Sequence, residues 1–203
     1  MTQQHLKHFR YVMGENPVTM FAFSLFALIV FLAVFGPLIT PHDPLATNAT
    51  NTLKPPSWNH AFGTDHLGRD VFSRVIAATR LDLGIAVSAV ALSFFIGGAL
   101  GCIAGFWGGW TDRIVGRFSD TIMAFPLFVL AMGIVASMGN TVENIIYATA
   151  IINLPFYARV ARAETSIRRN AGYVYAARLC GSSDARILAT QIFPNILPPM
   201  MVQ

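Results

Sequence analysis

The side chains most able to do chemistry lie in residues 60–74, a polar segment that precedes the long apolar run 83–106. His60 and His66 could ligate a metal ion, because imidazole is a common metal ligand. However, no cluster of further ligands surrounds them, and Asp65, Arg69 and Asp70 have the mixed charges of a local ion-pair network. The sequence therefore predicts no metal site here.

The charged side chains of this segment have two interpretations. Arg69, Asp70 and Arg74 could contact an external protein partner, or they could belong to a structural collar that closes one end of a helix bundle. The collar is the simpler interpretation, because exposed charges at such positions usually serve local ion pairs. Both remain open from the sequence.

Catalytic groups do not gather in the apolar runs, which hold no acidic residue and no nucleophile–base pair. The phosphate-binding pattern G-x-x-x-x-G-K is absent from the chain, so any ATP would be hydrolysed by another chain. Cys102 lies in an apolar run and Cys180 in a basic segment, which argues against a disulfide framework. We therefore expect a protein that is not an enzyme and that needs no cofactor.

A basic helix–glycine–helix segment occupies residues 172–194, with the sequence GYVYAARLCGSSDARILATQIFP. Residues 173–180 can form a short helix, and Gly181 stands where a left-handed C-cap belongs. Ser182 or Ser183 can cap the next helix, with Asp184 in its positive first turn. Pro194 marks the return to an apolar run.

The short helix of this segment has small and aromatic residues that could form a compact knob. We expect the following side chains to be exposed together and to fill a groove on a partner: Tyr173, Val174, Ala176, Ala177 and Leu179. The alternative is a plain connecting loop with a basic bias.

The composition places these features in a membrane protein. The 203 residues are 54% hydrophobic and 12% charged, whereas soluble domains have about 25% charged residues. The sequence pI of about 9.4 could suggest nucleic acid. Because the basic residues alternate with apolar runs rather than forming one stripe, we expect contact with membrane lipid and not with nucleic acid.

Four apolar runs are predicted as membrane-spanning helices, since about 20 residues cross a bilayer. They are Val18–Ile39, Leu83–Phe106, Thr121–Met138 and Asn144–Ala158, and a fifth run only begins before Gln203. The fold class is therefore an all-α membrane protein with four complete spans and the start of a fifth. In the second run, Gly97, Gly101 and Gly105 share one helix face, which suits close helix packing or reflects ordinary membrane glycines.

Two further features concern the ends of the second run. Val71, Phe72, Val75 and Ile76 recur at helical spacing and predict an amphipathic helix on the membrane face before this run, capped by Thr64 or Asp65. Trp107 and Trp110 suit the membrane interface.

The distribution of basic residues predicts the orientation. With the N-terminus in the cytoplasm, ten basic residues lie inside: Lys7, Arg10, Arg113, Arg117, Arg159, Arg162, Arg168, Arg169, Arg178 and Arg186. Only four lie outside: Lys54, Arg69, Arg74 and Arg80. The domains are then residues 1–40 (N-terminus and first span), 41–80 (external loop) and 81–203 (the remaining core).

The run YVYAARLCGSSDARILATQIFPN resembles the EAA loop of ABC importer permeases. Ala176, Ala177, Gly181 and Pro194 fall on that pattern, while Tyr175 stands at the glutamate position. Four further segments are similar to the second, C-type permease of the dipeptide, oligopeptide and nickel group. They are FGTDHLGRDVFSRV, AGFWGGWTDRIVGRFSD, IMAFP and FYARVARAE. The resemblance covers nearly the whole chain from Val18.

The resemblance implies a subunit of a type I importer that translocates di- or oligopeptides across the bacterial inner membrane by alternating access. Its partners would be a second permease subunit in a heterodimer, two cytoplasmic ATP-binding subunits and a periplasmic or lipid-anchored substrate-binding protein. The loop 159–195 would couple to the ATPases through Tyr175, Ala176, Ala177, Gly181, Ser182, Asp184, Arg186 and Pro194. Alternatives are a permease for nickel or glutathione-like substrates, and a truncated, nonproductive permease, since the family has about two further spans.

Overall fold

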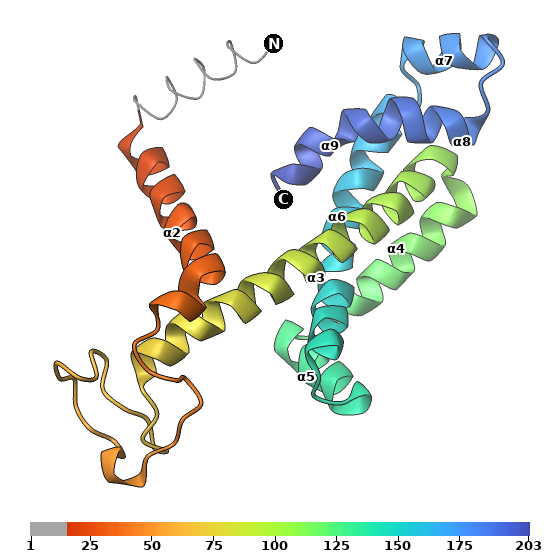
Figure 1. Ribbon diagram of the computed structural model, residues 1–203. Helices are drawn as coiled ribbons and strands as arrows, with labels where there is room; N and C mark the ends of the chain where they lie inside the picture. The colour runs from red at the N-terminus through yellow and green to blue at the C-terminus, as the bar shows by residue number, and fades with distance from the viewer. Residues whose placement is uncertain (1–15) are drawn as a thin grey trace. The chain divides into compact units, whose positions relative to one another are not determined.

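The computed structural model describes residues 16–203, which form helices with one isolated β-bridge between Thr64 and Asp70 (Figure 1). The chain divides into two compact units, Met1–Gly84 and Ile85–Gln203, which are described separately below. The prediction of a cytoplasmic N-terminus, with Lys7 and Arg10, rests partly on residues outside the described range.

Helix α2, Pro17–Ile39, confirms the first predicted helix almost to the residue. Asn16 caps it by accepting a hydrogen bond from the backbone N–H of Val18 at 3.1 Å, and Pro17 suits the first helical position because its missing N–H would have no partner there. Most of the apolar side chains of α2 are not covered by other parts of the chain. Such a surface is suited to lipid.

Helix α3, Val71–Trp107, is 37 residues long and runs from the first unit into the second. The prediction of a separate amphipathic helix is therefore wrong, because residues 71–76 are the first turns of the long helix itself. The predicted caps at Thr64 and Asp65 are also wrong. Asp70 holds this end by accepting a hydrogen bond from the backbone N–H of Ser73 at 2.8 Å.

The third predicted span is broken into two helices, α4 (Gly109–Met123) and α5 (Leu127–Met138), which meet at 95°. Pro126 explains the break, because proline lacks an N–H and disfavours a helical conformation in the residue before it. With 12 residues, α5 extends about 18 Å, less than the hydrocarbon core of about 30 Å. The straight span Thr121–Met138 is therefore not present.

The rest of the second unit is a series of five helical elements. Helix α6, Val142–Arg168, is capped by Thr141 and continues the fourth predicted span into the basic segment. After it come α7 (Gly172–Leu179), α8 (Asp184–Ile187), the π-helix η2 (Leu188–Ile192) and α9 (Phe193–Met201). Figure 1 shows α7 as a short helix beside α8.

The glycine face of α3 packs against the backbone of α6. A Cβ on Gly97 would lie 2.6 Å from the carbonyl oxygen of Leu154, and one on Gly105 would lie 2.5 Å from that of Arg162. Gly101 faces Ala158 between them. These contacts fall four residues apart on both helices, which confirms the close-packing interpretation of the glycines.

Two described helices, α2 and α3, are each long and apolar enough to cross a membrane, and α4 with α5 adds a third if the bent pair counts as one span. Four complete spans therefore stay a prediction.

Candidate coupling site

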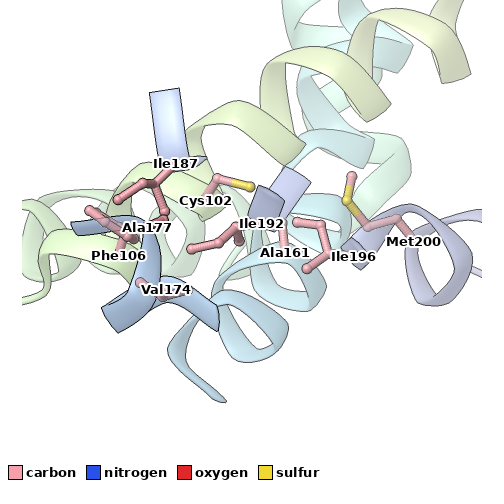
Figure 2. Close-up of a cluster of buried hydrophobic side chains, with 9 residues drawn as sticks. All are labelled: Cys102, Phe106, Ala161, Val174, Ala177, Ile187, Ile192, Ile196 and Met200. Atoms are coloured by element: carbon pink, nitrogen blue, oxygen red, sulfur yellow. The ribbon is translucent and has the colours of Figure 1, made fainter. Parts of the chain in front are cut away.

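Helix α7 is anchored by one buried face. Val174 is 0% exposed and Ala177 is 9% exposed. Figure 2 shows them with side chains from α3, α6, α8, η2 and α9 in one apolar cluster. The other members are Cys102, Phe106, Ala161, Ile187, Ile192, Ile196 and Met200. The short helix is therefore packed onto the unit and is not a loose connection.

The opposite face of α7 is open. Tyr173, Tyr175 and Leu179 are exposed, Leu179 at 90%. The prediction that Val174 and Ala177 join this exposed knob is wrong, because their three-residue spacing places both on the inner face of the helix. The exposed part of the knob is therefore aromatic and aliphatic.

Gly181 ends α7 in a Schellman motif. Its φ of +80° lies in the left-handed region that favours glycine. Its N–H donates to the carbonyl of Arg178 at 2.9 Å, and the N–H of Ser182 donates to that of Ala177 at 3.0 Å. This pattern satisfies two carbonyls that the helix end would leave free, and it confirms the predicted C-cap.

The chain turns into α8 through a second cap. Ser183, rather than Ser182, accepts a hydrogen bond from the N–H of Arg186 at 3.4 Å. Asp184 lies in the first turn and pairs with the Arg178 guanidinium at 3.2 Å. The same guanidinium lies 5.3 Å from the ring centroid of Phe106 on α3. Arg178 therefore connects three elements.

Pro194 lies near the start of α9, immediately after the π-helix η2. Proline cannot donate a backbone hydrogen bond, and π-type turns are one way in which a helix accommodates an interrupted ladder. The N–H of Phe193 accordingly donates to the carbonyl of Leu188, five residues earlier. The helix thus passes a proline without ending.

The C-terminal end of α3 is fixed to α6. The Gly105 carbonyl accepts hydrogen bonds from Ser166 at 3.5 Å and from Arg169 at 3.3 Å. A cation at this position also complements the negative end of the helix dipole. The elements around α7 therefore form a connected group.

In the first unit, the charged residues form local pairs. Arg69 Nε and Arg74 Nε lie 2.7 Å and 3.7 Å from Asp65 Oδ2. Asp70 is 3% exposed and pairs with His60 instead. These contacts suit the collar interpretation. Contact of Arg69 and Arg74 with an external partner stays a prediction, whereas Asp70, the third residue of that prediction, is buried in this unit and has little surface to offer a partner.

Both carboxylates have lowered pKa values. Desolvation raises the pKa of Asp65, but hydrogen bonds from Arg69 and from the Leu67 N–H outweigh it and bring the pKa from 3.8 to about 2. For Asp70, desolvation also raises the pKa, and hydrogen bonds from Ser73 and His60 lower it below its ordinary value. Both side chains are therefore ionised at neutral pH.

The structure also gathers a group that the sequence did not predict. His42 lies beside His60 and Asp70, and the two imidazole ring centroids are 4.9 Å apart. His66, the other candidate ligand, does not belong to this group. The 18-residue separation of His42 from His60 gave no local signal.

Two models of known protein families match parts of this chain. Residues 97–203 match the family described as "Binding-protein-dependent transport system inner membrane component". Residues 6–56 match "N-terminal TM domain of oligopeptide transport permease C".

Three relatives are similar over most of the chain. The dipeptide transport system permease protein DppC of Alkalihalophilus pseudofirmus is 36% identical, covering 93% of this chain and 62% of the relative. The di/tripeptide permease DppC of Pseudomonas aeruginosa is 37% identical, covering 98% and 67%. The glutathione permease GsiD of Pectobacterium atrosepticum is 36% identical, covering 86% and 58%.

The chain thus spans about two thirds or less of the length of these relatives. The match over residues 97–203 takes in α4 to α9 and the whole glycine face of α3. The chain therefore belongs to the family of binding-protein-dependent transport system inner membrane components.

Proposed function

We propose that the chain is a permease subunit of an ATP-driven importer of di- or oligopeptides, with α7 as the helix that docks onto an ATP-binding subunit. The observation that carries this proposal is the two-sided construction of α7, with Val174 buried and Leu179 90% exposed. A helix held on one face and apolar on the other is suited to a partner groove.

The partners follow from the same proposal. A second permease subunit completes the path, two ATP-binding subunits hydrolyse ATP, and a periplasmic or lipid-anchored protein delivers the substrate. The relatives named for dipeptides and di/tripeptides support a peptide substrate. In this proposal the protein lies in the bacterial inner membrane. The basic side chains at and after the end of α6, including Arg168 and Arg169, support a position of α7 on the cytoplasmic side of that membrane.

Movement would be transmitted through packed contacts. Because α7 contacts Phe106 of α3 through its buried cluster and through Arg178, a displacement of α7 would move the ends of α3 and α6 together. Rigid-body movement of packed helices is a common form of switching. Alternating access then needs no chemistry on this chain.

The test is a Leu179→Asp variant in vesicles that contain the chain with its permease, ATPase and binding-protein partners. Burial of a leucine contributes about 1.5–3 kcal/mol, so we expect ATP-dependent dipeptide uptake to fall at least about tenfold. The stability of the chain should not change, because Leu179 has almost no internal contacts.

The matched control is Leu45→Asp, which makes the same change at a side chain that is 75% exposed in the segment between α2 and α3. Uptake should persist in this control. Equal losses in both variants would contradict a specific role for α7. An excess of unlabelled glutathione that abolished dipeptide uptake would widen the substrate class, and wild-type failure with all partners present would favour a nonproductive permease.

A further inference from the structure

The group formed by His42, His60 and Asp70 lies in the first unit, between α2 and the start of α3. One nitrogen of each imidazole and one carboxylate oxygen all lie within 4.8 Å of one another. We propose that this group binds one divalent transition-metal ion of the zinc type, with these three residues as ligands and water completing the coordination.

The distance between two of the ligands already suits an ion. His60 Nδ1 lies 3.0 Å from Asp70 Oδ1. Zinc–nitrogen and zinc–oxygen bonds of about 2.0–2.2 Å place neighbouring tetrahedral ligands roughly 3.3–3.5 Å apart. The ion can therefore replace the proton between these atoms after a small outward movement.

Two of the ligands, His42 and Asp70, are also held by hydrogen bonds through a second side-chain atom, as is usual around metal sites. His42 Nε2 lies 2.7 Å from the carbonyl oxygen of Asn59. If the ring donates through Nε2, its free lone pair is on Nδ1. Asp70 Oδ2 accepts from the N–H of Ser73 at 2.8 Å, and the N–H of His42 donates to the Ser73 hydroxyl at 3.2 Å.

Burial and access also favour an ion. Asp70 is 3% exposed and its Oδ1 faces the His60 imidazole, so little water competes for that oxygen. His42 is exposed, which leaves a route for the ion and a position for water. Two imidazoles and one carboxylate suit zinc, nickel or copper better than the oxygen-preferring calcium and magnesium ions.

The competing interpretation is that Asp70 serves only as a helix cap. Capping uses Oδ2, whereas Oδ1 faces His60, and no part of the cap requires the His42 ring. The two interpretations therefore predict different effects of changing His42.

The experiment titrates Zn²⁺ into the full chain, purified in detergent and stripped by a chelator, with calorimetry as the readout. We expect one ion per chain and an affinity loss of at least about tenfold in His42→Gln and in Asp70→Asn. Asparagine can still cap the helix, so the second variant separates the ion from the cap. His66→Gln is the matched control and should bind as wild type.

A background from the two histidines at positions 5 and 8 is removed by repeating the titration in a His5→Gln/His8→Gln chain. Zn²⁺ should raise the unfolding temperature of this chain, and the added His42→Gln change should abolish that increase without altering the metal-free value. The proposal is overturned if the His5→Gln/His8→Gln chain binds no ion stoichiometrically, or if His42→Gln leaves the affinity unchanged.

Discussion

Gly101 is the position at which the packing of α3 on α6 can be tested most directly. A Cβ there would lie 2.8 Å from Cβ of Ala161 and 2.9 Å from the carbonyl carbon of Ala158. Ordinary carbon–carbon contacts are about 3.5–4.0 Å, and neither atom is the end of a flexible side chain. Gly101→Val therefore forces the two helices apart by about 1 Å.

The expected cost is about 1–3 kcal/mol in the free energy of unfolding, as for other overpacked sites. The matched control is Gly84→Val on the same helix, because a Cβ on Gly84 meets nothing within 4 Å. In this control, the replacement of glycine by valine changes the helix propensity by only a few tenths of a kcal/mol.

The assay is a denaturant titration in detergent, in which unfolding is monitored by the fluorescence of Trp107 and Trp110 near the end of α3. Equal unfolding free energies for the two valine variants would refute the close contact between α3 and α6.

Three further predictions concern other contacts. Gly181→Val should destabilise the second unit by about 1–2 kcal/mol, because valine is strained at the φ of +80°, and it should also reduce coupled uptake; an unchanged unfolding midpoint and unchanged uptake would contradict this. Asp112→Asn removes a half-exposed ion pair between α4 and Arg162, so the unfolding free energy should fall by less than about 1 kcal/mol and the loss should shrink in high salt. Asp65 has a folded pKa of about 2 against an ordinary 3.8, so its stabilising effect is complete above pH 3.8 and is lost as the pH falls towards 2. The protection factors of the backbone amides in the segment between α2 and α3, which correct for the slower intrinsic exchange at low pH, should fall over that range in wild type, and Asp65→Asn should flatten the response.

Features set by local chemistry were predictable from the sequence. The first helix follows from an uncharged run, and the structure begins it one residue before the prediction, at Pro17. The left-handed C-cap at Gly181 was predictable because such a cap depends on only a few adjacent residues. The glycine face of α3 follows from a four-residue repeat, although only the structure identifies α6 as its partner.

Features that depend on distant residues were not predictable. Val174 and Phe106 are 68 positions apart, yet both belong to the same buried apolar cluster. His42 and Asp70 come together only because the chain between α2 and α3 folds back on itself. The break at Pro126 had a local signal, but the uniform hydropathy of residues 121–138 outweighed it in the prediction.

In the proposed docking of α7, the burial of Val174 and Ala177 decides how a displacement of this helix would be passed on. A flexible loop would bend when a partner displaced it, and the displacement would be lost before it reached the membrane. In this chain, α7 is joined to α3 by the apolar cluster and by Arg178 over Phe106, while the end of α3 is joined to α6 through the Gly105 carbonyl. Because tightly packed elements move together rather than deform, the proposed docking at Leu179 would displace helices that this side chain does not touch.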